Sequence, residues 1–297
     1  MSGAGKRASK FPLRLDELSS RSKVARKPVV PAVAPAPTIA PKLQATAAAA
    51  RAVLRPQRLV EHAHDYAARR VAPSGVGLDS VDVRKRMAAR LRGAGVNHEA
   101  VLAAMATVPR HRFVDAALVT QAYEDTSLPI GHGQTISKPS VVARMIELLM
   151  GGASARASGS LGRVLEVGTG CGYQAALLAL LAVQVISVER LRPLHDKARE
   201  LLAPLRRANL RLVYGDGMRG HPPNAPYDSI IAAAGGDALP PAWLEQLAVG
   251  GRLVSPVRLA GSDRQVLMVV DRGEHGFEHN AYEAVHFVPL KSGLVAG

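Results

Sequence analysis

Three glycines mark a place in this chain where a small molecule could bind. They follow the apolar run 164–167, which carries one acid, Glu166, and they stand at every second position: Gly168, Gly170 and Gly172. This pattern predicts a buried strand that turns sharply into a helix beginning near residue 173. Backbone can approach a ligand closely at such a turn, because glycine has no Cβ.

The spacing of the glycines narrows the class of ligand. A dinucleotide turn needs Gly-x-Gly-x-x-Gly, whose glycines hold a pyrophosphate at the helix N-terminus. Here Tyr173 stands where the third dinucleotide glycine would be, and Glu166 would place a negative charge where phosphate is unfavourable. The pattern therefore favours a positively charged nucleoside without phosphates, such as S-adenosyl-L-methionine, and makes an oxidoreductase the least favoured class.

Two further acids follow predicted strands and could complete a nucleoside pocket. Glu189 ends the strand 184–189, where an acid can accept both ribose hydroxyls, and Asp216 follows the strand 210–214, where it could accept from an adenine amino group. Alternatively, Glu189 only caps the next helix and Asp216 only holds a turn. Their common place at strand ends favours binding. The expected cofactor-binding set is Glu166, Gly168, Thr169, Gly170, Gly172, Glu189, Asp216 and Gly217.

Strands and helices alternate from residue 163 onward, which predicts a parallel sheet with helices on both faces. We expect strands at 163–168, 184–189, 210–214, 227–234 and 251–257, and helices at 173–182, 191–204 and 240–248. The last strands, 264–271 and 282–288, are joined by a short connection and should form an antiparallel edge. The predicted class is α/β: a Rossmann-like, doubly wound, mostly parallel seven-stranded sheet.

An N-terminal helical subdomain is expected at 81–150, ahead of the α/β core at 163–297. Ser80 or Asp82 can cap a first helix, and Asn97 can cap a second helix that closes before Pro109. A short segment at 113–122 and a loop at 128–139 then lead into a helix over 140–150.

The bulk composition separates a basic tail from the rest of the chain. The first 80 residues hold 14 of the 38 lysines and arginines but only five of the 24 acids, so most of the net charge of +14 lies there. Residues 31–50 contain four prolines and nine alanines, a composition typical of disorder. We expect residues 1–80 to be a solvated tail, with a nucleic-acid or partner-binding arm and a targeting sequence as alternatives.

The cysteine count and the lengths of the apolar runs limit which other classes of protein the chain could belong to. A single cysteine excludes an intramolecular disulfide framework and a multi-cysteine zinc site, and it suits a cytoplasmic setting. We expect no membrane span, because charges or glycines interrupt every apolar run. We also expect no bound metal. Cys171 should be a small turn residue.

Several segments resemble a known family. The glycine turn, Glu189 and Gly215-Asp-Gly217 resemble class I S-adenosylmethionine-dependent methyltransferases. The segment Leu128-Pro-Ile-Gly-His-Gly-Gln-Thr-Ile-Ser-Lys-Pro139 is more specific and is similar to the Gly-x-Gly-Gln-Thr-Ile-Ser-x-Pro signature of protein-L-isoaspartate O-methyltransferases. Further similar segments are 108–114, 225–228, 247–253 and 285–290. The resemblance covers about 81–297; Cys171 stands where many members have Ser, and Lys138 where Gln or another residue is common.

The resemblance implies a protein repair enzyme. It would transfer a methyl group from S-adenosyl-L-methionine to the free carboxylate of L-isoaspartyl residues, and in many members of D-aspartyl residues, in damaged proteins. The methyl ester then gives a succinimide, which hydrolyses partly to normal aspartyl. The implied partners are peptides and proteins with L-isoaspartyl residues, and we expect a monomer. The resemblance also implies a variant order of the C-terminal strands.

Ser137 is the expected catalytic residue. It lies near the start of the helix over 140–150, where free N–H groups favour an anion, and the resemblance implies that it donates a hydrogen bond to the substrate carboxylate. Gln134, Thr135 and Ile136 would shape the substrate pocket, and His132 should be a loop residue rather than a catalyst. Without the resemblance, helix capping explains Ser137 equally well.

Two other functions remain compatible with the residues alone. A methyltransferase acting on RNA or a small molecule would use the same cofactor, although Ala232-Ala-Ala-Gly-Gly236 stands where amine methyltransferases carry an Asn/Asp-Pro-Pro-Tyr run. A non-catalytic RNA-associated protein would bind through the tail, with strong salt dependence. Nucleic-acid binding is not expected of the core.

Overall fold

The computed structural model describes residues 80–296, so the tail predicted for residues 1–80 lies almost wholly outside the described residues. Ser80 is the exception. It is buried, and its Oγ accepts a hydrogen bond from the Asp82 N–H at 3.1 Å, as the N-cap of helix α2 (Val81–Gly93). Ser80 rather than Asp82 therefore caps the helix.

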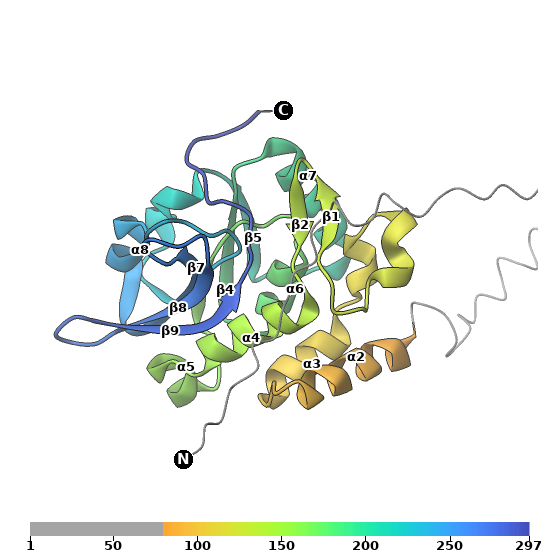
Figure 1. The fold of residues 1–297 in the computed structure, drawn as a ribbon, viewed down its shortest axis with the longest axis horizontal. Coiled ribbons are helices and arrows are strands. Elements are labelled where there is room, and N and C mark those ends of the chain that lie inside the picture. Colours follow the sequence, from red (N-terminus) through yellow and green to blue (C-terminus); the bar gives the residue numbers. More distant parts are fainter. Residues whose placement is uncertain (1–79, 297) are drawn as a thin grey trace, which may run out of the picture. The chain divides into compact units, whose positions relative to one another are not determined.

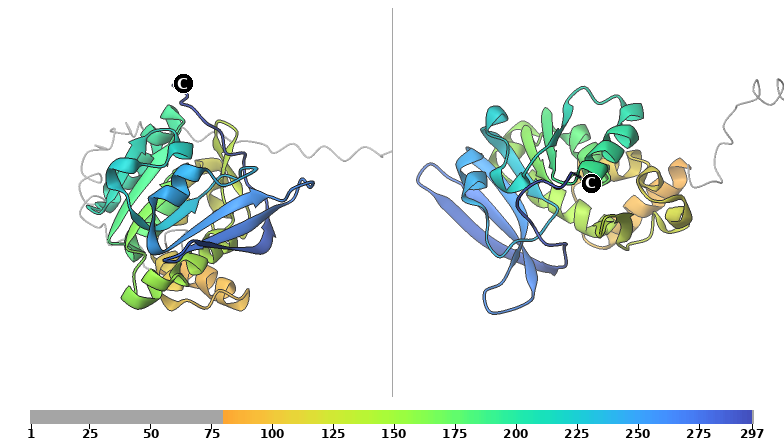
Figure 2. Two further views of the ribbon diagram at one scale, coloured as in Figure 1. Left: turned by 90° about the vertical axis from the view of Figure 1, so that its left-hand side faces the viewer. Right: turned by 90° about the horizontal axis from the view of Figure 1, so that it is seen from above.

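A seven-stranded sheet forms the centre of the described part (Figures 1 and 2). Its order is β5-β4-β3-β6-β7-β8-β9, with parallel pairing from β5 to β7 and antiparallel pairing from β7 to β9. The predicted fold class and its antiparallel edge are confirmed. The strands are β3 (Arg163–Val167), β4 (Gln184–Glu189), β5 (Leu210–Tyr214), β6 (Tyr227–Ala232), β7 (Leu247–Arg258), β8 (Gln265–Arg272) and β9 (Phe277–Val285).

The sheet is buried on both faces because alternate residues of its strands enter two different hydrophobic clusters. On β3, Val164 belongs to the cluster under the N-terminal helices, whereas Leu165 and Val167 belong to the cluster that contains Trp243. The helices of the α/β part are α6 (Tyr173–Leu181), α7 (Arg192–Leu202) and α8 (Pro241–Gln246), with short 3₁₀ turns η4 (Ala203–Leu205), η5 (Gly217–Arg219) and η6 (Pro222–Asn224). Both faces being covered explains why the strands are almost continuously apolar.

The predicted boundaries near the C-terminus differ from the observed ones. Strand β9 spans 277–285 instead of 282–288, because the hairpin to β8 is tight and pairs Arg272 with Phe277. The apolar residues after β9 leave the sheet edge, and the Gly235 N–H donates to the Val288 carbonyl at 2.9 Å. Strand β7 begins at Leu247, so helix α8 ends two residues before the predicted boundary at 248.

The N-terminal part, predicted to be helical, also contains a small β-hairpin. Its elements are α2, α3 (Glu99–Thr107), η2 (Arg110–Phe113), η3 (Ala116–Gln121), β1 (Leu128–Gly131), β2 (Gln134–Ile136), α4 (Pro139–Met150) and α5 (Ala153–Ser158). Asn97 does not cap α3; the N-cap is His98, without a side-chain cap, and Glu147 of α4 accepts from the N–H groups of both residues. A distant carboxylate thus replaces the local cap that the sequence suggested.

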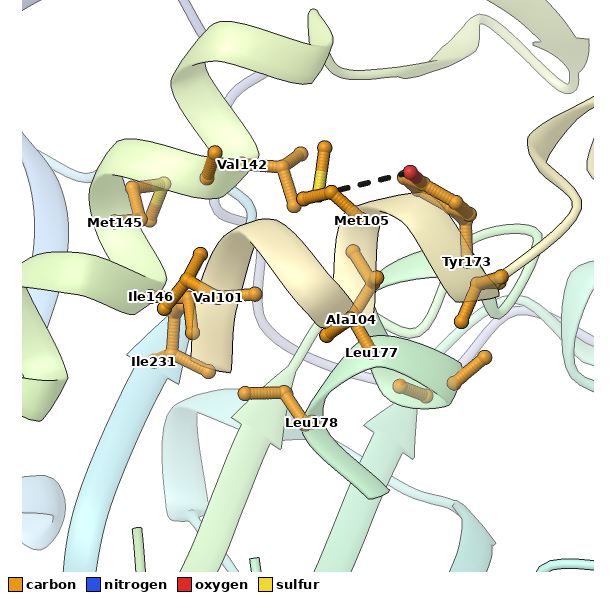
Figure 3. Close-up of a cluster of buried hydrophobic side chains, with 14 of the residues drawn as sticks. Val101, Ala104, Met105, Val142, Met145, Ile146, Tyr173, Leu177, Leu178 and Ile231 are labelled. Atoms are coloured by element: carbon orange, nitrogen blue, oxygen red, sulfur yellow. Dashed lines mark hydrogen bonds between the residues drawn. The ribbon is translucent and has the colours of Figure 1, made fainter. Parts of the chain in front are cut away.

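Helices α3, α4 and α6 meet in a cluster of buried side chains that joins the N-terminal part to the sheet (Figure 3). Met105 of α3 lies at its centre with no exposed surface, and the Tyr173 hydroxyl at the start of α6 donates to its sulfur at 3.7 Å. Because Tyr173 directly follows the glycine turn, this packing also fixes where the turn ends.

Replacing Met105 with Ala should lower the free energy of unfolding by about 2–5 kcal/mol, because it leaves a cavity in a fully buried cluster. Urea denaturation measures this. Val183→Ala is the control, since Val183 is 68% exposed and its truncation should change stability by about 0.5 kcal/mol or less. A similar small loss for Met105→Ala would show that the cluster is not tightly packed.

Candidate active site

The glycine turn has the backbone geometry that its sequence predicts. All three glycines have positive φ: 91° at Gly168, 55° at Gly170 and 91° at Gly172. Only the first two line a cavity. A Cβ on Gly172 would lie 2.8 Å from Leu202 Cδ1 on helix α7, so that glycine is required by helix packing rather than by a ligand.

The cavity lies at the carboxyl ends of strands β3, β4 and β6 and encloses about 250 Å³. This is the edge at which open α/β sheets bind ligands. The β1–β2 hairpin and the segment 288–291 contribute to its wall. The predicted site residues that line it are Gln134, Thr135, Ile136, Ser137, Gly168, Thr169, Gly170, Glu189 and Gly217.

Glu189 connects two strand ends beside this cavity. Its Oε2 accepts from the Gly170 N–H at 2.9 Å, and its Oε1 accepts from the Leu191 N–H at 2.9 Å. Each oxygen keeps a further lone pair, and the residue lines the cavity. The side chain therefore both holds the turn and remains able to accept from ribose hydroxyls.

Asp216 occupies a different position from the one that its predicted role requires. Its Oδ1 accepts from the Met218 N–H at 3.0 Å and caps η5, while its Oδ2 accepts from the Gly293 N–H at 2.8 Å. It does not line the cavity, although the adjacent Gly217 does. The alternative interpretation, that Asp216 holds a turn, describes the observed contacts.

Glu166 is fully buried beneath the turn and does not line the cavity. The Ser187 hydroxyl donates to its Oε2 and also contacts the Thr169 hydroxyl, while Oε1 has no partner among the described residues. Burial raises the pKa of Glu166 to about 8, so the carboxyl is largely neutral at pH 7. The expected repulsion of phosphate by a charge on Glu166 is therefore wrong for this environment.

The segment 128–139, expected to be a loop, forms the β1–β2 hairpin. Its turn has three successive residues with positive φ, Gly131 at 97°, His132 at 54° and Gly133 at 68°, which places the His132 side chain at an exposed tip. Ser137 follows β2 and lines the cavity half-buried, but the N-cap of α4 is Lys138 and has no side-chain hydrogen bond. Ser137 therefore does not cap this helix.

Several cavity residues carried no sequence prediction of a site role. Gln174, with a buried Nε2 that lacks a partner among the described residues, follows the glycine turn. The residues Val288, Pro289, Leu290 and Lys291 reach the cavity because Leu290 pairs with Gly235 at the end of β6. The similarity of 285–290 to the methyltransferase segment is the signal in the sequence for Val288, Pro289 and Leu290.

Metal chemistry and thiol chemistry find no support at this site. Within residues 80–296 there is no group of three or more His, Cys, Asp or Glu side chains that could hold a metal ion. Burial raises the pKa of the Cys171 thiol to about 11, which leaves almost no thiolate at neutral pH.

Within residues 80–296, every helix is too short or too polar to cross a membrane.

The profile of the protein-L-isoaspartate(D-aspartate) O-methyltransferase family matches residues 82–295. The chain belongs to this family. A protein-L-isoaspartate O-methyltransferase of Methylibium petroleiphilum is 56% identical over 294 residues and covers 99% of both chains. One of Leptothrix cholodnii is 61% identical over 243 residues, covering 80% of this chain and 84% of the relative. The family prediction is confirmed, and the likeness extends into the tail, beyond the expected limit at residue 81.

Solved structures agree with the family. A protein-L-isoaspartate O-methyltransferase superposes with a TM-score of 0.63 at 29% identity, covering 71% of this chain and 67% of the other. A putative one from Plasmodium falciparum, solved with S-adenosyl-L-homocysteine, superposes with a TM-score of 0.60 and covers 70% and 98% of the two chains. At 24% identity, this second likeness bears on the fold alone.

Glu166→Gln should change how stability depends on pH. The pKa of Glu166 rises from 4.5 to about 8 on folding, so between these values only the folded state keeps the proton. Stability from this group is fully present below pH 4.5 and falls as the pH rises to about 8, by up to about 1.4 kcal/mol per unit. Urea unfolding of both proteins from pH 5 to 8.5 should show the Gln variant gaining on the wild type, whereas parallel curves would contradict the buried neutral acid.

Proposed function

We propose that the chain transfers a methyl group from S-adenosyl-L-methionine to the free carboxylate of L-isoaspartyl residues in damaged proteins, in the cavity at the carboxyl ends of β3, β4 and β6. Membership of the family supports the reaction. The observation that carries the site is that Ser137, from the family-like segment, lines the same cavity as the glycine turn and Glu189.

The donor side of the cavity fits a nucleoside. Gly168 and Gly170 bring backbone close to the cavity, and an added Cβ on Gly170 would lie only 3.2 Å from Cδ1 of Ile130, which also lines it. Glu189 would accept from the ribose hydroxyls, while Thr169 and Gly217 border the same space. S-adenosylmethionine supplies a methyl group already activated on a cationic sulfur.

The acceptor side would come from the N-terminal part, residues 81–150. Ser137 would donate its hydroxyl proton in a hydrogen bond to one carboxylate oxygen and so orient the other toward the methyl carbon. Ile136 is buried beside it, and Gln134 and Thr135 border the opening. The hairpin would exclude water from the reacting atoms, where positioning supplies most of the rate.

No general base is required for this transfer. A substrate carboxylate with a pKa of about 4 is ionised at neutral pH, so its oxygen bonds to the methyl carbon while the carbon–sulfur bond breaks and the electron pair stays on sulfur. Neither His132 nor Cys171 is needed as a base: His132 reaches the cavity from the exposed hairpin tip, and Cys171 is a buried thiol.

Tritiated methyl transfer from S-adenosylmethionine should label a peptide that contains L-isoaspartate at least about 100-fold faster than its normal-aspartate twin, because only the former presents the displaced carboxylate. A D-aspartyl peptide in the same assay tests the second substrate class. Equal labelling of the isoaspartyl and aspartyl peptides would overturn the proposed function.

Ser137→Ala should lower kcat/KM for the isoaspartyl peptide about 10- to 100-fold, the loss of about 1.4–2.7 kcal/mol expected for a hydrogen bond to a charged group. Cofactor affinity should not change. Ser140→Ala is the matched control, because its hydroxyl donates to Asp125 at 2.7 Å and does not line the cavity. Unchanged turnover in Ser137→Ala, or an equal loss in both variants, would remove Ser137 from the mechanism.

A further inference from the structure

Arg110 is a charged side chain with no exposed surface, placed directly behind the cavity wall. Its Nε donates to the Ala122 carbonyl at 2.8 Å, and its Nη2 donates to the Ser137 carbonyl at 2.8 Å. The guanidinium carbon lies 4.9 Å from the ring centroid of Tyr173, which lines the cavity as Ser137 does. The side chain therefore contacts the acceptor side of the site from behind.

The positive charge of Arg110 has no anion in direct contact, although Asp125 acts on it from beyond ion-pair distance. Among residues 80–296 it forms no ion pair, and its buried Nη1 makes no hydrogen bond there. Burial lowers the pKa of the guanidinium, but arginine starts so high that it stays protonated. A buried charge without a directly paired counterion is costly, because the ring of Tyr173 and the more distant Asp125 offset only part of its desolvation.

The hydrogen bonds explain only part of this arrangement. The guanidinium also donates to the Thr126 carbonyl at 3.4 Å, but carbonyls can be joined by a neutral donor, so this clamp does not by itself require a cation. A permanent positive charge behind Ser137 does match one expected occupant of the cavity, the substrate carboxylate, which must also leave water to react.

We propose that Arg110 is a positioning residue for the acceptor: it fixes the backbone of Ser137 and supplies the positive charge that offsets the substrate carboxylate inside the cavity. This inference rests on the proposed function. It makes the charged carboxylate itself, rather than the peptide around it, the feature that the wild-type protein selects.

The first test uses the wild-type protein. Peptide binding is measured by calorimetry with S-adenosylhomocysteine present, so that no reaction occurs. An isoaspartyl peptide should bind at least about 10-fold more tightly than the same peptide with a carboxamide in place of the free carboxylate, a difference of about 1.4 kcal/mol. Equal affinities would overturn the inference without any mutant.

The second test separates the charge from the hydrogen bonds. Arg110→Gln keeps a carbonyl-binding donor but loses the charge, and should bring the preference for carboxylate over carboxamide to within about twofold. Arg110→Lys keeps the charge and should retain most of that preference, with a lower KM for the isoaspartyl peptide than the Gln variant. An unchanged preference in Arg110→Gln would show that the residue is only a clamp.

Arg90→Met is the matched control. Arg90 donates through Nη2 to the Tyr123 carbonyl at 2.7 Å, next to the residue that Arg110 clamps, but unlike Arg110 it has no hydrogen bond to Ser137 among the described residues. The Arg90→Met variant should keep the wild-type preference for carboxylate over carboxamide. Loss of that preference in this variant too would assign the effect to the backbone at 122–123 and overturn the inference.

Thermal melting and S-adenosylhomocysteine affinity report whether each variant folds. For any variant that fails to fold, the comparison of the two peptides on the wild-type protein remains decisive. Failure of the proposed function can be told apart from failure of this inference, because in the former case the wild-type protein would not methylate the isoaspartyl peptide.

Discussion

The carboxylate of Glu189 connects the end of strand β4 to the glycine turn that follows the neighbouring strand β3. One oxygen binds the Gly170 N–H and the other binds the Leu191 N–H, both at 2.9 Å. The Gly168 N–H adds a bond to the Val188 carbonyl at 2.9 Å. Within the turn the Gly172 N–H donates to the Thr169 carbonyl at 2.9 Å, and the bonds to strand β4 hold its first half. The cavity, the start of α6 and the packing of Tyr173 depend on the shape of this turn.

The sheet was predictable because its signal is local. Runs of apolar residues that end in glycines or acids predict parallel strands buried on both faces, and five of the seven strands were placed within two residues at their N-terminal ends. The two exceptions, β7 and β9, differ for non-local reasons. Strand β7 begins early because Leu247 pairs with Tyr227 of β6. Pairing with β8 lets β9 begin at Phe277, in a segment with little apolar character, and the apolar Val288 pairs with Gly235 outside the edge strand.

The site was less predictable, because an acid at a strand end can face either a ligand or the backbone. Glu189 lines the cavity, Asp216 accepts from two backbone N–H groups, and Glu166 faces the interior beside Ser187. The sequence places all three near one edge of the sheet but does not contain the side-chain directions. The structure of the segment 128–139 could also be predicted only in part. Its glycines indicate a turn, but the pairing of Leu128 with Ile136 that makes it a hairpin is not visible in the local sequence.

Glu166 and Arg110 are buried ionisable groups near the cavity, and they respond to burial in different ways. Glu166 can release its charge by holding a proton, and its raised pKa shows that burial favours this. Arg110 has no neutral form within reach at physiological pH, so the desolvation of its charge remains. The surrounding carbonyls of Ala122 and Ser137 offset part of it through hydrogen bonds. The ring of Tyr173 and the more distant Asp125 offset a further part, yet Nη1 has no hydrogen-bond partner among the described residues. An anion that enters the cavity would offset more of the cost. For an enzyme that methylates a carboxylate, the acceptor is such an anion, and the incompletely compensated arginine then favours the ionised form that reacts.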